Sequence, residues 1–346
     1  MGARWRQCGT RVIAAAMAAA LVAAWGALPA RGQDSGNHWD VLAGRETDDH
    51  AIQGQAFFPM VITVAAGDTV RWALGGQYSH TVTFLSRQPG PISPLVTPDG
   101  RSVVNPLLEY AQGGTTYDGT RYTNSGILSP RASTYELTFS TPGVYPYVCL
   151  LHRGMEGTVV VVPTSSQPPM TPAEYTALGE REWSVVRERG EGLAQSAPVV
   201  TEPVPGATNY YISSGFGANE ASVLRFLPQE LVIHVGDTVT WVQSDPQEMH
   251  TVTFGDDTAP TSLTTTETAV LGPPVTVLDP QATQPQGGPV HRGVGYYNSG
   301  IMQPFARYTL TFLQPGTYSY VCLRHASLGQ VGTIVVQPQE ASPGGS

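Results

Sequence analysis

An internal repeat constrains the fold of this 346-residue chain more than any other feature of its sequence. Four blocks of the first half recur in the same order in the second half, with an offset of 169 to 174 residues. The paired blocks are FFPMVITVAAGDTVRW (57–72) with FLPQELVIHVGDTVTW (226–241), HTVTF (80–84) with HTVTF (250–254), YTNSGILSP (122–130) with YYNSGIMQP (296–304), and YELTFSTPGVYPYVC (135–149) with YTLTFLQPGTYSYVC (308–322). A period this long indicates two whole domains and not a solenoid of short repeats.

Each repeat has the pattern of short β-strands. The segment VITVAAGDTVRW alternates around a Gly-Asp turn, and YELTFSTPGVYPYV is two strand-like runs separated by Pro-Gly. The chain contains 38 Gly and 29 Pro but only 13% charged residues, a balance typical of short strands and many turns. The sequence therefore predicts an all-β fold of two antiparallel sandwiches or barrels.

The repeat also predicts the division of the chain. The expected parts are a leader at 1–32, a first β-domain at 33–166, a linker at 167–206, a second β-domain at 207–340 and a tail at 341–346. Segments 86–123 and 255–295 interrupt the domains as Pro-, Thr- and Gly-rich loops, and loops this long are typically functional or mobile.

The linker contains the one convincing helix of the sequence. It begins with a capping box, TPAE (171–174), in which Pro occupies the first helical position, and its pattern ends near Arg189, before Gly190. The segment SAPVVTEPVPG (196–206) then has the composition of an extended Pro-rich linker. We expect the helix to be a structural spacer with a solvated charged face.

The N-terminal segment has the pattern of a secretory signal peptide. Arg4, Arg6 and Arg11 form a basic region, an Ala-rich apolar run follows at 12–28, and small residues lie near Ala30. The alternative is an uncleaved membrane anchor, since the run approaches the ~20 residues that a membrane span needs. The sequence therefore predicts a secreted or extracytoplasmic protein of the periplasm or cell surface, which contacts a membrane only if the anchor is retained.

The charge of the chain excludes one class of partner. The formal net charge is −9, and every basic residue is Arg. Removal of the leader deletes four arginines and no acids, so the mature chain carries 14 − 27 = −13. An acidic body of this kind argues against a nucleic-acid partner and fits a basic or neutral one.

The cysteines indicate two separate thiol sites. Cys8 lies in the leader, which leaves Cys149 and Cys322 in the mature chain. Two cysteines in a secreted protein also allow a disulfide. However, each occupies the same place in its own repeat and is followed three residues later by a histidine, which favours one thiol site in each domain.

The loop after the first of these cysteines has metal-ligand spacing. Cys149, His152 and Met155 follow one another at intervals of three residues, and strand alternation places His80 and Cys149 at the edge of one apolar interior. Each residue alone has a simpler interpretation: His80 as a partly buried histidine, Met155 as a side chain that fills the core, and Cys149 as a buried, unreactive thiol. Together, two histidines, a thiolate and a thioether form the ligand set of a blue-copper electron-transfer centre.

The second loop retains three of these donors and changes the fourth. His250, Cys322 and His325 correspond to the donors of the first domain, but the loop is two residues longer before its closing Gly-Thr. Alignment on that Gly-Thr places Gln330 in the position of Met155, whereas the shorter spacing would place Leu328 there. A Gln amide oxygen is an axial copper ligand, and this harder donor favours Cu(II), so the second site is expected to have the lower potential.

Both repeats resemble cupredoxin domains of the plastocyanin/azurin family. The resemblance rests on the GDTV-x-W strand, the strand-borne His, the Asn-Ser-Gly block and the PG-x-Y-x-YVC-x2-H loop, and it covers residues ~40–162 and ~210–337. It implies Greek-key β-sandwiches that bind type 1 copper. The implied ligands are His80, Cys149, His152 and axial Met155 in an amicyanin-like loop, and His250, Cys322, His325 and axial Gln330 in a loop of plastocyanin-like length.

The chain departs from the family pattern at one position beside each site. Thr81 and Thr251 follow the first ligand histidine, where many family members have Asn. A threonine side chain in this position can still form a hydrogen bond across to the Cys loop.

The leading functional hypothesis is an electron carrier without catalytic residues, which exchanges electrons with an unidentified redox partner protein. A copper oxidase or nitrite reductase requires further histidines, but no His-x-His occurs, and the remaining histidines are scattered at His38, His50, His234 and His291. Copper storage or delivery favours Met- or His-rich open sites, and the seven Met are not clustered. A metal-free structural module is the fourth possibility.

Overall fold

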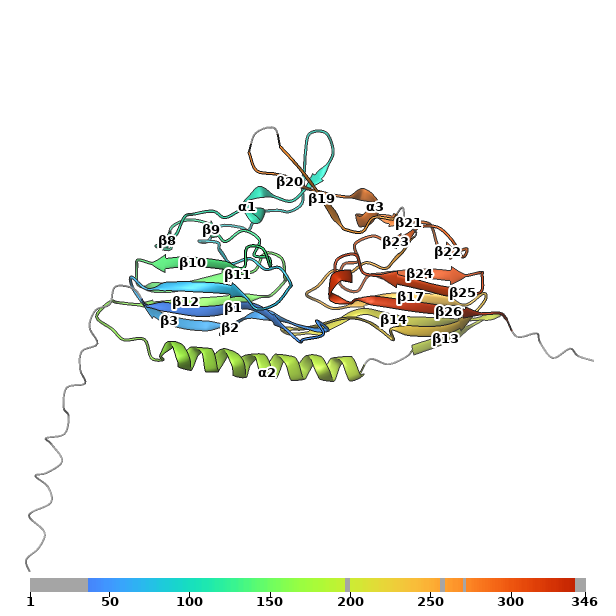
Figure 1. The fold of residues 1–346 in the computed structure, drawn as a ribbon, viewed down its shortest axis with the longest axis horizontal. Coiled ribbons are helices and arrows are strands. Elements are labelled where there is room, and N and C mark those ends of the chain that lie inside the picture. The colour runs from blue at the N-terminus through green and yellow to red at the C-terminus, as the bar shows by residue number, and fades with distance from the viewer. Residues whose placement is uncertain (1–36, 197–199, 256–258, 270–271, 340–346) are drawn as a thin grey trace, which may run out of the picture. The chain divides into compact units, whose positions relative to one another are not determined.

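The computed structural model of the chain describes residues 37–196, 200–255, 259–269 and 272–339 (Figure 1). The expected leader at 1–32 and tail at 341–346 lie outside the described residues. Within these ranges, no helix combines the length and the apolar character that crossing a membrane requires.

The first domain is built almost entirely from β-strands, as the alternating pattern predicts. Its elements are β1 (His38–Glu46), β2 (Ile52–Phe58), β3 (Val61–Ala65), β4 (Thr69–Leu74), β5 (Thr83–Phe84), β6 (Leu95–Val96), β7 (Ser102–Val103), α1 (Pro106–Glu109), β8 (Thr116–Tyr117), β9 (Thr123–Asn124), β10 (Thr134–Phe139), β11 (Gly143–Val148) and β12 (Glu156–Val162).

The second domain repeats this order after the linker. The linker contains α2 (Pro172–Ser196) and β13 (Val200–Val204). The domain consists of β14 (Ala207–Ala218), β15 (Ala221–Leu227), β16 (Glu230–His234), β17 (Thr238–Ser244), β18 (Thr253–Phe254), β19 (Thr264–Glu267), β20 (Val275–Leu278), α3 (Pro280–Thr283), β21 (Pro285–Gln286), β22 (Val290–His291), β23 (Tyr297–Ser299), β24 (Arg307–Phe312), β25 (Gly316–Val321), the 3-10 turn η1 (Ala326–Leu328) and β26 (Val331–Gln337).

One sheet runs through both domains. Its 11 strands follow the order β22-β24-β17-β14-β15-β2-β1-β4-β10-β8, with β13 added on β14. The domains meet where β15 pairs with β2 in antiparallel register (Ala221 with Gly54, Ser222 with Gln53, Val223 with Ile52). Each domain closes its sandwich with a sheet of its own, β3-β12-β11-β5-β9 in the first and β16-β26-β25-β18-β23-β21 in the second.

The sheets are mixed, whereas the sequence predicts an antiparallel sandwich or barrel. β1 pairs with β4 in parallel, and β3 pairs with β12 in parallel. The physical reason is that the Gly-Asp turn after β3 does not close a hairpin. It carries the chain from one sheet to the other, so that neighbours within a sheet come from distant parts of the chain.

Large aromatic side chains fill the centre of each sandwich. In the first domain Trp72 packs edge-on against Tyr147, with ring centroids 5.3 Å apart, and both side chains are buried. Trp241 and Tyr320 repeat this pair at the same 5.3 Å in the second domain. Since Tyr147 lies two residues before Cys149, strand alternation places the thiol on the same inward face, at the edge of the aromatic core.

The two long loops contact each other across the domains. Strands β6 and β7 from segment 86–123 and β19 and β20 from segment 255–295 form a four-stranded sheet with the order β19-β20-β7-β6 (Figure 1). Arg101 in the first loop forms an exposed ion pair of 2.5 Å with Glu267 in the second. Each loop forms a short antiparallel pair of its own, and the two pairs join where Val277 pairs with Val103, a contact between domains that strand alternation does not predict.

The linker helix is longer than predicted, and it packs against the shared sheet, whereas we expected a solvated spacer. It continues to Ser196, past Gly190, because that glycine lies in its buried face and not at its end. A Cβ atom on Gly190 would lie 2.4 Å from the side chain of Ile52, so the missing side chain permits close helix–sheet packing. The helix packs against β1 and β2 of the first domain and against β14 and β15 of the second.

Part of the predicted extended linker forms a strand. β13 pairs with β14 from Val200 to Val204, opposite Tyr211 to Ala207. The isolated Pro203 is accommodated because β13 lies at an edge of the sheet, where one face of its backbone has no strand to pair with.

A buried histidine is expected to make the second domain sensitive to acid. His291 lies in an aromatic cluster with Phe254, Phe312 and Tyr318, at the position that Tyr117 occupies in the first domain. Burial lowers the pKa of His291 to about 4. The unfolded chain, with a histidine pKa near 6.5, therefore binds the proton more tightly, and the free energy of unfolding falls as the pH drops from about 6.5 towards 4.

Substitution of His291 by tyrosine is expected to remove this acid sensitivity. The His291→Tyr variant should lose roughly 2 kcal/mol less stability than the original protein between pH 7 and pH 4.5, because its side chain binds no proton in that range. Chemical denaturation at the two pH values measures the difference. Equal losses in the two proteins would contradict the assignment.

Candidate metal centres

The first centre forms at one end of the first sandwich, where an isolated β-bridge and a loop lie close together. An isolated β-bridge to Leu128 holds the backbone of His80: His80 N–H donates to the Leu128 carbonyl at 3.2 Å, and the His80 carbonyl accepts from Leu128 N–H at 2.7 Å. Cys149 follows β11, and His152 lies in the loop that leads to β12. The Cys149 Sγ lies 3.9 Å from Nδ1 of His80 and 3.4 Å from Nδ1 of His152, and all three residues are buried.

The second centre repeats this geometry. The Cys322 Sγ lies 3.9 Å from Nδ1 of His250 and 3.4 Å from Nδ1 of His325. The three residues are buried, and in each centre the donor atoms lie within 4.8 Å of one another. The structure thus brings together all six histidines and cysteines that the sequence proposes as ligands.

The residues predicted as axial donors occupy equivalent backbone positions. Cys149 N–H donates to the carbonyl of Met155 at 2.9 Å, and Cys322 N–H donates to the carbonyl of Gln330 at 3.0 Å. The two additional residues of the second loop are accommodated by η1, which ends at Leu328 and packs that side chain beside Tyr78. The loop therefore places Gln330, and not Leu328, in the position of Met155.

The side chain of Gln330 faces the metal donors directly. Its Oε1 lies 2.9 Å from Nδ1 of His250 and 2.9 Å from Nδ1 of His325, and these two nitrogens are 3.2 Å apart. The amide nitrogen of Gln330 is buried without a hydrogen-bond partner. Met155 is likewise buried, in the core cluster that contains Cys149.

Both thiols are poised to be thiolates. Burial alone would raise the pKa of Cys149, but the charge of His152 and hydrogen bonds from both imidazoles hold that pKa well below its usual value of 9. The same balance with His325 and His250 lowers the pKa of Cys322. Because the thiolate is the form that binds metal, two imidazoles and one thiolate in each buried cluster fit a soft ion such as copper.

The threonines that replace the usual Asn support the Cys loops. Thr81 N–H donates to the Cys149 Sγ at 3.3 Å, and its hydroxyl accepts from Leu150 N–H at 2.7 Å. Thr251 makes the same two contacts in the second domain, at 3.3 Å to Cys322 and 2.8 Å from Leu323. The hydrogen bond across to the loop is therefore retained with Thr in place of Asn.

Loss of this hydroxyl is expected to destabilise the first centre. Thr81→Val leaves the Leu150 N–H without its acceptor, which should lower the free energy of unfolding of the metal-free protein by about 1 to 3 kcal/mol. Thr81→Ser keeps the hydroxyl and serves as the matched control. Chemical denaturation of both variants measures the effect, and equal stabilities would argue against a role for the hydrogen bond.

Sequence reasoning missed a glycine beside each centre. Gly44 lies in a bulge of β1 with φ of 71°, and a Cβ atom there would lie 2.0 Å from Nε2 of His80. Gly215 lies in a bulge of β14 with φ of 96°, and its Cβ would lie 2.2 Å from Nε2 of His250. The signal was present in the repeat, since the two glycines are 171 positions apart, within the offset of the other blocks.

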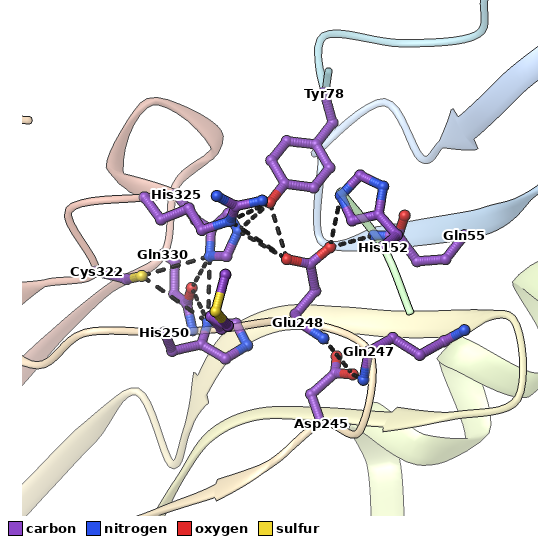
Figure 2. A network of polar contacts seen from close by, with 12 residues as sticks. Gln55, Tyr78, His152, Asp245, Gln247, Glu248, His250, Cys322, His325 and Gln330 are labelled. Atoms are coloured by element: carbon purple, nitrogen blue, oxygen red, sulfur yellow. Dashed lines mark hydrogen bonds and ion pairs between the residues drawn. The ribbon is translucent and has the colours of Figure 1, made fainter. Parts of the chain in front are cut away.

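Sequence reasoning also missed a polar cluster between the two centres. Glu248 lies among His152, His325 and Tyr78, and Figure 2 shows its carboxylate facing both ligand imidazoles. Burial would raise the pKa of Glu248, but His152, His325 and Arg324 outweigh burial and hold it well below its usual range. The pKa values of His152 and His325 rise to about 9 because the nearby carboxylate and thiolates outweigh burial.

The remaining histidines do not join either centre. Within the described ranges, the two His-Cys-His groups are the groups of three such donors close enough to share an ion. His50 pairs with Glu46, His234 lies beside Asp237, and His291 belongs to the aromatic cluster described above.

Comparison with known families identifies both halves of the chain. The model of the family described as copper binding proteins, plastocyanin/azurin family, matches residues 47–162 and 213–337. These ranges include all the histidines and cysteines of the two centres, and together they cover well over half of the sequence.

Solved structures give weaker similarities. A Cu(I) form of an amicyanin mutant is 24% identical, covers 39% of this chain and 87% of its own, and has a TM-score of 0.24. A purple cupredoxin from Nitrosopumilus maritimus is 22% identical over 37% of this chain and 98% of its own, with a TM-score of 0.22. A mutant fern plastocyanin is 24% identical over 36% and 99%, with a TM-score of 0.23. No curated protein matches the chain.

Proposed function

Because the chain belongs to the plastocyanin/azurin family of copper-binding proteins, we propose that it is an extracytoplasmic type 1 copper protein that transfers single electrons, with one ion in each domain. The observation that carries the proposal is the pair of buried His-Cys-His clusters with the same 3.4 and 3.9 Å spacings. The predicted leader supports an extracytoplasmic location, and the partner is a redox protein that accepts or supplies the electron.

The residues of each centre suit this function. Copper held by such ligands supplies one-electron chemistry by alternating between Cu(II) and Cu(I). Cys149 and Cys322 offer thiols whose pKa values the neighbouring imidazoles lower, and the histidines present Nδ1 towards them. His80 and His250 are fixed by backbone bridges, so the donors keep their positions when the charge of the site changes.

The two centres are proposed to differ in potential. Met155 offers a thioether to the first, whereas Gln330 offers an amide oxygen to the second, and the harder oxygen favours the oxidised ion. An electron would then enter at the second centre and leave from the first. Potentiometric titration measures both reduction potentials, and equal values would contradict the proposed direction of electron transfer.

A cavity supports access of a partner to the first centre. It has a volume of about 330 Å³ and is lined by both domains, including Cys149, Met155, Pro246 and Met249. Apolar residues share its lining with Arg153, Glu156 and Gln247, a mixed composition that suits a transient contact with a redox protein.

Titration of the metal-free protein with Cu(II) tests the proposal. We expect two ions per chain, an intense thiolate charge-transfer band in the visible spectrum and blue-copper signals alone in EPR. A colourless product would exclude type 1 copper, and an additional EPR signal of another copper type would favour an oxidase.

A further inference from the structure

Glu248 and Tyr78 hold equivalent positions in the two repeats. Tyr78 lies two residues before His80, and Glu248 lies two residues before His250. Each side chain stays beside the C-terminal ligand histidine of its own domain and also reaches the corresponding histidine of the other domain (Figure 2). They meet between the two C-terminal ligand histidines, with the Tyr78 hydroxyl donating to Glu248 Oε2 at 2.9 Å.

This pair contacts a ligand imidazole on each side. Towards the first centre, Glu248 Oε1 lies 3.1 Å from Nε2 of His152. Towards the second centre, the Tyr78 hydroxyl lies 2.8 Å from Nε2 of His325, and Glu248 Oε2 lies 3.6 Å from the same nitrogen. One carboxylate and one phenol thus span the whole distance between the two rings.

The orientation of the two histidine rings determines which atom donates and which accepts in these contacts. Each histidine presents Nδ1 to its cysteine, so metal binding there leaves the hydrogen on Nε2. His325 then donates to the Tyr78 oxygen and Tyr78 donates to Glu248, whereas Nε2 of His152 faces Glu248 Oε1 as an ion-pair contact. A ligand histidine whose other N–H is held by a carboxylate is fixed in its ring orientation.

The cluster is buried, and further hydrogen bonds anchor it. The side chains of His152, His325 and Glu248 are 0%, 0% and 1% exposed. Gln55 donates to Glu248 Oε1 at 2.7 Å, and the Arg324 guanidinium donates to the Tyr78 hydroxyl at 2.6 Å. The Glu248 backbone N–H donates to Asp245 Oδ1 at 3.2 Å, which fixes the turn that carries the carboxylate.

We propose that Glu248 and Tyr78 form an internal bridge that couples the two centres and carries single electrons between them. The inference rests on the proposed function, since it requires both centres to be redox-active. One electron leaves the reduced centre, which is oxidised, and reaches the oxidised centre, which is reduced. No bond is formed or broken, and no proton is transferred.

The test follows the electron after partial reduction of the fully copper-loaded protein by pulse radiolysis. The original protein should show a first-order redistribution between the two centres whose rate is independent of protein concentration. Glu248→Leu should slow this step by about 10-fold or more, because it removes the contacts to both rings. Tyr78→Phe should slow it as well, because loss of the hydroxyl removes the hydrogen bonds to His325 and to Glu248.

Reduction potentials provide a second readout. Glu248→Gln keeps the shape of the side chain but removes a negative charge shared by both centres, so both potentials should rise together. Arg101→Ala is the matched control, because it breaks a contact between the domains that lies outside the bridge. It should leave the rate and both potentials unchanged.

The possible results distinguish failure of the bridge from failure of the proposed function. Failure of the original protein to bind two reducible ions would overturn the proposed function itself. If the unsubstituted protein binds two reducible ions, and Glu248→Leu and Tyr78→Phe leave the rate of electron transfer between the centres unchanged, only the bridge is overturned. If Glu248→Leu fails to load copper, Tyr78→Phe and Glu248→Gln decide the question, and unchanged rates and potentials in both would contradict the proposal.

Discussion

Cys149→Ser is expected to abolish the blue-copper centre of the first domain and to leave the second intact. Serine is nearly the same size as cysteine but provides no thiolate, so neither the strong copper bond nor the charge-transfer band can form. The variant should therefore bind one copper ion in place of two and retain only the spectrum of the Gln330 centre.

Cys322→Ser is the reciprocal variant and should retain only the spectrum of the Met155 centre. Visible absorption, EPR and copper analysis of both single variants count the centres and distinguish their spectra. The double variant should be colourless. A single variant that keeps both bands, or loses both, would contradict two independent type 1 centres.

Gly44→Ala is expected to displace His80 and to weaken copper binding in the first domain by about 10- to 100-fold. A Cβ atom at this position would lie 2.0 Å from the ring nitrogen of a ligand, and the positive φ of 71° adds strain for any side chain. Because the bulge of β1 is held by strands on both sides, the histidine is the group that must move. Gly215→Ala should act in the same way on His250.

Gly67→Ala provides the control for this prediction. Gly67 has φ of 98°, but no atom lies within 4 Å of the position of its Cβ. The substitution therefore adds the backbone strain, roughly 1 to 2 kcal/mol, without contact to the centre. Gly236 is the matched position in the second domain. Copper titration of the four variants measures the difference, and equal affinities would show that the glycines are needed only for the backbone.

The strands and the histidine and cysteine donors could be predicted because their signals are local and occur twice. The HTVTF block and the Cys-x2-His loop each have the same spacing in both repeats, and β-alternation places them on one inward face. The position of Gln330 could also be predicted, because the closing Gly-Thr fixes the register of the loop even though η1 changes its length. These features depend on residues near one another in the sequence or on the repeat.

The contacts between domains could not be predicted in this way. Tyr78 and Glu248 differ in type, so comparison of the repeats marks them as unrelated substitutions. Their meeting depends on how the sandwiches join, which is fixed by backbone pairing of β2 with β15 and by the loop sheet. The end of the linker helix was predicted wrongly at Gly190 for a related reason. A helix-ending glycine and a close-packing glycine are identical in sequence, and only the neighbouring strand distinguishes them.

The junction of the shared sheet has a local twofold symmetry. Ile52 pairs with Val223, and Gly54 pairs with Ala221. With the offset of 169 that relates Phe57 to Phe226, Ile52 corresponds to Ala221 and Gly54 to Val223, so each pair is the symmetry mate of the other. The edge that one domain offers is therefore self-complementary. The two domains of this one chain thus meet with the symmetry of an isologous interface, the arrangement that two identical subunits adopt in a twofold dimer.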